Sequence, residues 1–129
     1  MVTMEECSAY ASKIKATDYW KQHKGWLRVN LHHGAGHRSA KYYRAWSGRQ
    51  RCVVLPKWAR SEIVMIHEFA HCLTDRTTGG DYSGHGTHFC GHYLNLVGEL
   101  LGEDYKNRLM EQFDEDGVRY HFQKSKNKG

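Results

Sequence analysis

The chain lacks the cysteine pattern of a zinc ribbon or of a disulfide-stabilised domain. It has 129 residues and 4 cysteines, and these are widely scattered: Cys7, Cys52, Cys72 and Cys90. No Cys-x-x-Cys pair exists, which argues against a ribbon, and scattered cysteines without an export signal argue against a disulfide framework. We expect thiols that form no disulfide, with Cys72 and Cys90 used for core packing.

Long apolar runs are also missing. No stretch approaches the roughly 20 apolar residues that a membrane-spanning helix requires. The N-terminus, Met1 to Glu6, lacks the basic-then-apolar order of a signal peptide. The chain shows no repeat or internal linker. We therefore expect a cytoplasmic protein with no membrane partner, built as one domain over residues 1–122 with a disordered basic tail at 123–129.

Acidic residues are outnumbered: 19 Lys and Arg stand against 14 Asp and Glu, giving a net charge of +5. The basic residues gather in the first half of the chain and in the tail. In the first half, aromatic residues lie between them. Such a mixture is compatible with nucleic-acid binding, because cations track phosphates while aromatic rings stack on bases. A solvated basic face with the aromatic residues in the core is the favoured interpretation. The aromatic residues concerned are Tyr19, Trp20, Trp26, Tyr42, Tyr43, Trp46 and Trp58.

The first half of the chain predicts one helix followed by short strands. Thr3 and Glu6 form a capping box for a helix that runs to about residue 16. Residues 26–31 alternate between apolar and polar like a half-buried strand, residues 32–37 suggest a glycine-rich turn, and residues 42–46 and 52–55 suggest two more strands. Pro56 should end the last strand.

The second half predicts helices. Ser61 is a candidate N-cap for a helix with an apolar stripe at Ile63, Ile66, Ala70 and Leu73. Residues 77–84 predict a loop, residues 88–101 a second helix ending at Gly102, and residues 103–113 a third. On the third helix Tyr105, Leu109 and Phe113 should share one side. The predicted fold class is α+β, with a short mixed sheet of about three strands packed on helices.

The sequence His67-Glu68-Phe69-Ala70-His71 is the most informative motif. On a helix, His67 and His71 lie one turn apart and can direct two imidazoles at one Zn²⁺. Glu68 lies beside them and can act as general base. The motif therefore predicts one zinc ion and hydrolytic chemistry, with Glu68 as the catalytic residue and a zinc-bound water as nucleophile.

A hydrolytic zinc site usually has three protein ligands, so a third must be found. His85 is the preferred candidate, because glycines on both sides allow the backbone to direct its ring towards the first helix. His88 lies about one turn further on and is an alternative. Glu99 on the second helix, which would supply a carboxylate, is another.

These residues resemble the SprT-like zinc metallopeptidases, in which a His-Glu-x-x-His helix is followed by a short loop and then by His-Gly-x-x-Phe. Gly84 to Cys90 is similar to the third-ligand segment of that family. The run Leu55 to Arg60 also resembles small metallohydrolases of actinobacteria and their phages. The resemblance covers roughly residues 52–118. It implies a zincin-like fold, with a short mixed sheet, an N-terminal helix, the active-site helix and a second helix, and His85 as the ligand that completes the site.

The chain departs from that family in one respect that concerns partners. Many SprT proteins carry a C-terminal zinc ribbon, which this sequence lacks, so the DNA-dependent proteolysis of parts of the family does not carry over. The absence of a third histidine at the metzincin spacing also separates the chain from that neighbouring class. The resemblance therefore supports the metal site more strongly than it supports a substrate.

Several further polar residues are candidates for supporting roles. An oxyanion donor could come from any of five side chains, and the sequence does not choose among them: Tyr82, His88, His92, Tyr120 and His121. Asp75 could orient a ligand imidazole, although a solvent-facing role is equally compatible with its position. His32, His33 and His37 lack rigid helical spacing, and we assign them no catalytic role.

Two functions follow from these patterns. The first is a zinc-dependent metallopeptidase acting on a peptide or protein substrate, bound along a strand edge. The alternative is a non-catalytic module, stabilised by zinc, that associates with nucleic acid through its basic first half. Glu68 favours the peptidase, because a structural zinc site needs four protein ligands and no general base.

Overall fold

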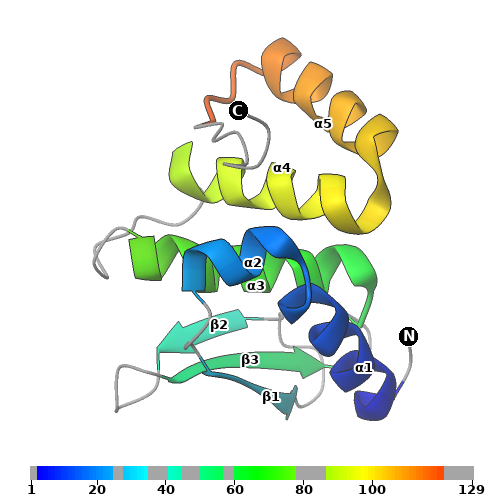
Figure 1. Ribbon diagram of the computed structural model, residues 1–129, viewed down its shortest axis with the longest axis vertical. Coiled ribbons are helices and arrows are strands. Elements are labelled where there is room, and N and C mark those ends of the chain that lie inside the picture. Colours follow the sequence, from blue (N-terminus) through cyan, green and yellow to red (C-terminus); the bar gives the residue numbers. More distant parts are fainter. Residues whose placement is uncertain are drawn as a thin grey trace.

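The computed structural model describes residues 3–24, 28–34, 41–44, 50–56, 60–77 and 87–120. For residues 24, 41–44, 50–52, 56 and 75–77 the backbone alone is described. Helices and strands are stacked in layers along the long axis (Figure 1). The sheet lies at one end, followed by α3 (Glu62–Thr77), then α4 (Thr87–Leu101), and α5 (Glu103–Glu115) lies at the other end. Helices α1 (Met4–Lys15) and α2 (Asp18–Lys24) lie alongside these layers. The predicted α+β class, with a short mixed sheet, is confirmed.

Helix α1 (Met4–Lys15) begins as the sequence predicts. The Thr3 hydroxyl accepts a hydrogen bond from the Glu6 amide, and the Glu6 carboxylate accepts one from the Thr3 amide, which completes a capping box. The inward side of the helix is apolar and buried: Cys7, Tyr10, Ala11 and Ile14. Helix α1 thus contributes one wall of the main core.

Helix α2 (Asp18–Lys24) does not appear in the sequence prediction. At 7 residues it is too short to show a clear helical period. It buries Tyr19 and Trp20, and the Trp20 ring packs on Phe69 of α3 with 5.4 Å between centroids. These two aromatic side chains therefore belong to the core, as the favoured interpretation of the basic, aromatic-rich half expects.

Within the described residues, three strands form a sheet in the order β1-β3-β2. Strand β1 (Arg28–Gly34) is parallel to β3 (Gln50–Pro56), and β2 (Lys41–Arg44) is antiparallel to it. The predicted turn at residues 32–37 is wrong in its first half, because His32, His33 and Gly34 continue β1 and pair with the end of β3. Pairing along β3 outweighs the local turn tendency of glycine here. The remaining residues of that turn lie outside the described ranges.

Arg60 ties the sheet to the beginning of α3 (Glu62–Thr77). This buried side chain donates from Nε to the Leu55 carbonyl at 3.2 Å, and from Nη2 to Nδ1 of His33. The Ser61 hydroxyl then accepts from the Val64 amide at 3.2 Å, as predicted for an N-cap. The direction of α3 is therefore fixed by both parallel strands.

Helices α4 (Thr87–Leu101) and α5 (Glu103–Glu115) are separated by Gly102, whose φ of 108° lies in the left-handed region that favours glycine. On α5, the side that carries Tyr105, Leu109 and Phe113 is only partly buried. Tyr105 is 45% exposed, whereas Lys106 is buried. The stem of Lys106 lies across Gly98 of α4, where an added Cβ would come within 2.7 Å of its Cδ. The small Gly98 thus leaves room for the aliphatic stem of Lys106.

Helices account for most of the described residues, and a single main core joins α1, α2, α3, α4 and the two parallel strands. Three cysteines, Cys7, Cys72 and Cys90, are buried and form no disulfide, as expected. In the described part of the chain, no helix combines the length and the apolar character needed to cross a membrane.

Candidate metal centre

Helix α3 brings His67 and His71 together on one face, as their spacing predicts. Their ring centroids lie 5.1 Å apart with an angle of 75° between the ring planes. The His67 side chain is 35% exposed, whereas Phe69 and Ala70 between the two histidines are fully buried. The helix therefore turns its apolar side to the core and leaves the two imidazoles at the margin of the structure.

The separation of the two rings fits a shared zinc ion. Two histidines with nitrogens about 2.0–2.1 Å from one Zn²⁺, in tetrahedral arrangement, place their ring centroids about 5 Å apart. The observed 5.1 Å agrees with that value. Imidazole nitrogen is also a donor that zinc prefers, so both the chemistry and the spacing of this pair suit the metal.

Glu68 lies beside the pair in an apolar setting. Its side chain is 7% exposed, and its Oε2 lies 4.0 Å from Nε2 of His67. Burial raises the pKa of the Glu68 carboxyl from 4.5 to about 7, because the charged form loses hydration. A bound dication would oppose this effect by favouring the carboxylate. A carboxyl whose pKa lies near neutrality suits reversible proton transfer.

Two aromatic residues of α4 line the other side of the histidine pair. The Phe89 ring lies 4.4 Å from the His71 ring and 5.0 Å from the His67 ring. Tyr93 stacks on Phe89 at 5.8 Å and meets His67 edge to face at 6.0 Å. The helical pattern of residues 88–101 does not by itself connect Phe89 and Tyr93 with the histidine pair. Only the packing of α4 on α3 brings them to it.

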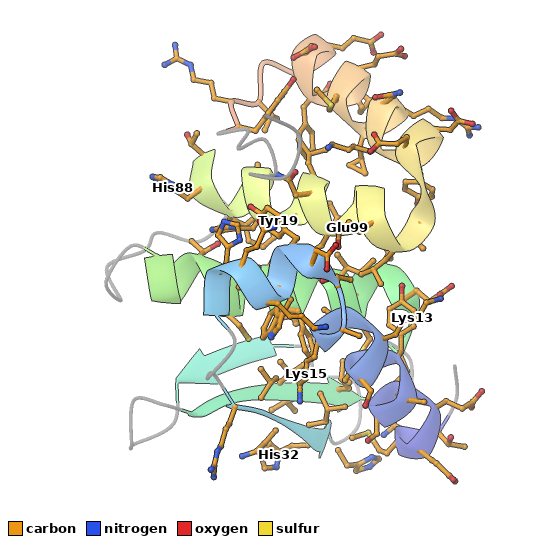
Figure 2. All side chains as sticks on the ribbon, in the orientation of Figure 1. Lys13, Lys15, Tyr19, His32, His88 and Glu99 are labelled. Carbon is orange, nitrogen blue, oxygen red and sulfur yellow. The ribbon has the colours of Figure 1, made fainter. Side chains whose placement is uncertain are left out.

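The third ligand is not decided by the described residues. His85, the preferred candidate, and Tyr82 lie outside them. His88 is exposed in the first turn of α4, where Figure 2 shows its side chain directed outward. Glu99 is exposed and accepts a hydrogen bond from the Tyr19 amide at 3.4 Å. Within the described ranges, no group of three or more His, Cys, Asp or Glu side chains could hold a metal ion.

Two candidate oxyanion donors are engaged elsewhere in the structure. His92 is buried, and its Nδ1 lies 2.9 Å from the Tyr19 hydroxyl. The His23 ring packs on both, 4.1 Å from the Tyr19 ring and 5.5 Å from the His92 ring. The Tyr120 hydroxyl donates to Asp114 at 3.4 Å. His121, the remaining candidate, lies outside the described residues.

Two further histidines singled out from the sequence belong to the sheet. His33 accepts from Arg60 at the sheet, and His32 is exposed on β1. His37 and the side chain of Asp75 lie outside the described set. Cys72 donates from Sγ to the Glu68 carbonyl at 3.6 Å, which is consistent with the packing role predicted for it.

Comparison with known proteins returns no match: no family model, no curated protein and no solved structure is similar to this chain. The SprT-like resemblance and the zincin-like fold therefore stay predictions from the motif.

Proposed function

We propose that the protein is a zinc-dependent metallopeptidase with a zincin-like arrangement around α3. One observation carries this proposal: the buried Glu68 carboxyl lies 4.0 Å from Nε2 of His67, a nitrogen that can bind zinc. A carboxyl at that distance from a ligating nitrogen is within hydrogen-bond reach of a water that shares the same ion. A purely structural zinc site has no use for such a group.

His67 and His71 would hold the ion from α3, and His85 is the third ligand that the sequence favours. When bound, Zn²⁺ supplies a water of lowered pKa and polarises the substrate carbonyl. Glu68 then accepts the proton of the attacking water and passes it to the leaving amine. The position of its carboxyl beside the histidine pair supports this role.

The variant Glu68→Gln tests the proposal, because glutamine keeps the shape of the side chain but cannot accept the proton. We expect kcat to fall by about 10²- to 10⁴-fold on a quenched fluorescent peptide library, with zinc content unchanged. Glu111→Gln, the same change at an exposed glutamate of α5, is the matched control and should retain full activity. Loss of zinc from Glu68→Gln would assign Glu68 to metal binding and contradict the general-base role.

The non-catalytic nucleic-acid module gains no specific support from the described residues. Two of the aromatic side chains that base stacking would need, Tyr19 and Trp20, are buried in the core. If the wild-type protein binds zinc, cleaves no member of the peptide library and binds single-stranded DNA with a steep dependence on salt, the module replaces the peptidase.

A further inference from the structure

Three aromatic rings form a closed triangle at the metal centre. Phe89 of α4 contacts both imidazoles of α3, at 4.4 Å from His71 and 5.0 Å from His67, while the imidazoles lie 5.1 Å from each other. The Phe89 ring is tilted by only 34° from the His71 plane and by 65° from the His67 plane. One side chain therefore limits the rotation of both candidate ligands.

Phe89 is itself held in place. It is 4% exposed, it packs with Ala70 and Cys90 in a small apolar cluster, and Tyr93 stacks on it with an angle of 11° between the rings. Aromatic pairs in such contact add about 0.5–1.5 kcal/mol beyond the burial of their surface. The Phe89 ring is thus held in one position, and the rings of His67 and His71 pack against it.

We infer that Phe89 is a positioning residue, which orients His67 and His71 before a metal ion arrives. The torsion that turns a histidine ring about its Cβ–Cγ bond is broad, so a histidine at a margin samples many orientations. Ordering two rings on binding costs conformational entropy, and a neighbour that orders them beforehand increases metal affinity. Phe89 contacts no reacting atom in this role. It acts through the two imidazoles.

This inference rests on the proposed function in so far as the metal is zinc. The orientation of the rings is a property of the metal-free protein as well, so it can be measured without zinc. The inference about Phe89 and the proposed function can therefore fail independently of each other.

The experiment compares Phe89→Leu with Phe113→Leu. Both changes replace an aromatic side chain by an apolar one against the same small cluster, but the ring contact of Phe113 is to Tyr120 on the side of α5. Zinc affinity is measured by competition with a chromophoric chelator. The histidine ring signals of the metal-free proteins are followed by NMR, and urea unfolding records stability.

Phe89→Leu should weaken zinc binding by about 10- to 100-fold, the range typical of groups that orient metal ligands. Phe113→Leu should lower stability and leave zinc affinity within about 3-fold of the wild type. In the metal-free protein, the ring signals of His67 and His71 should shift and broaden in Phe89→Leu alone. Tyr93→Leu, which removes the ring stacked on Phe89 together with the longer contact to His67, should give a smaller loss. This variant replaces Phe89→Leu if Phe89→Leu does not fold.

Equal zinc affinity in folded Phe89→Leu and wild-type protein would overturn the inference, as would unchanged signals of both histidines in the metal-free variant. If the wild-type protein binds no zinc, the proposed function fails instead. The ring signals of the metal-free proteins then still decide whether Phe89 orients the pair.

Discussion

Two pairs of histidine rings in this protein have nearly the same geometry and different surroundings. His67 and His71 lie 5.1 Å apart at 75°, and His23 and His92 lie 5.5 Å apart at 80°. The first pair comes from successive turns of one helix. The second is brought together by α2 and α4, close to the position of Tyr19 in Figure 2.

The difference lies in what the ring nitrogens contact. In the second pair both Nδ1 atoms lie near Tyr19: that of His92 is 2.9 Å from its hydroxyl, and that of His23 is 2.8 Å from its carbonyl. In the first pair, the buried Glu68 carboxyl lies 4.0 Å from Nε2 of His67, and the His67 side chain is partly exposed. Ring spacing alone therefore does not define a metal site. The nitrogens must also be directed at an accessible position with suitable charge nearby.

The largest expected effect is on zinc affinity and separates the two pairs directly. His71→Gln should weaken zinc binding by more than about 100-fold, because losing a ligand costs more than losing a group that orients one. His92→Gln, the same substitution in the second pair, should leave zinc affinity unchanged in the folded protein. Chelator competition measures both.

The same measurement extends to the candidates for the third ligand. His85→Gln should behave like His71→Gln, whereas His88→Gln should behave like His92→Gln. Zinc content and affinity unchanged in His85→Gln would remove His85 from the site, and a loss in His88→Gln would assign the role to that residue.

The second effect concerns stability in the metal-free protein. The folded-state pKa of Glu68 is raised to about 7 from 4.5, so the folded chain keeps a proton that the unfolded chain releases between these values. The contribution of the protonated Glu68 carboxyl to the free energy of unfolding is therefore fully present below pH 4.5 and is lost as the pH rises through 7. Glu68→Gln avoids this loss and should be more stable than the wild type at pH 8, by up to about 3 kcal/mol.

Urea unfolding in the presence of EDTA, at pH 5 and pH 8, measures the difference between the two proteins. The advantage of Glu68→Gln should shrink towards pH 5. Parallel pH profiles for the two proteins would show that the carboxyl is well solvated in the folded state, contrary to its burial.

The third effect is confined to the second pair. Tyr19→Phe removes the hydroxyl that faces Nδ1 of buried His92, which should cost about 1–3 kcal/mol of unfolding free energy. Zinc affinity should not change. Tyr105→Phe removes a hydroxyl from a residue that is 45% exposed and should alter stability by less than about 0.5 kcal/mol. A loss of zinc affinity in Tyr19→Phe would show that the two pairs are coupled through α4.

Local signals in the sequence predict much of the fold. Three features of helix ends each depend on only one or two residues, and the structure contains all three. They are the Thr3 and Glu6 capping box, the Ser61 N-cap and the end of α4 at Gly102. The helical spacing of His67 and His71 also survives folding, because both residues belong to one element whose period fixes their relation.

Features that depend on contacts between elements are the ones the sequence misses. Helix α2 is too short to show a period, and its place is set by the burial of Tyr19 and Trp20 against other helices. The burial of Lys106 depends on Gly98, a residue of another helix that leaves room for its stem. The contacts of Phe89 with both histidines likewise require α4 to pack on α3, which no local pattern encodes.

The arrangement of the sheet has a consequence for the order of folding. The antiparallel partner β2 precedes β3 closely in the chain, so these two strands can pair early as a hairpin, within about 1–10 μs. Strand β1 is parallel to β3 and more distant along the chain, so its pairing closes a longer loop and comes later. Arg60 bonds to His33 on β1 and to Leu55 on β3 immediately before α3 begins. We therefore expect the helix that carries His67 and His71 to reach its final direction only after β1 has joined the sheet. The metal binding proposed for this helix would then be one of the last properties that the folding chain acquires.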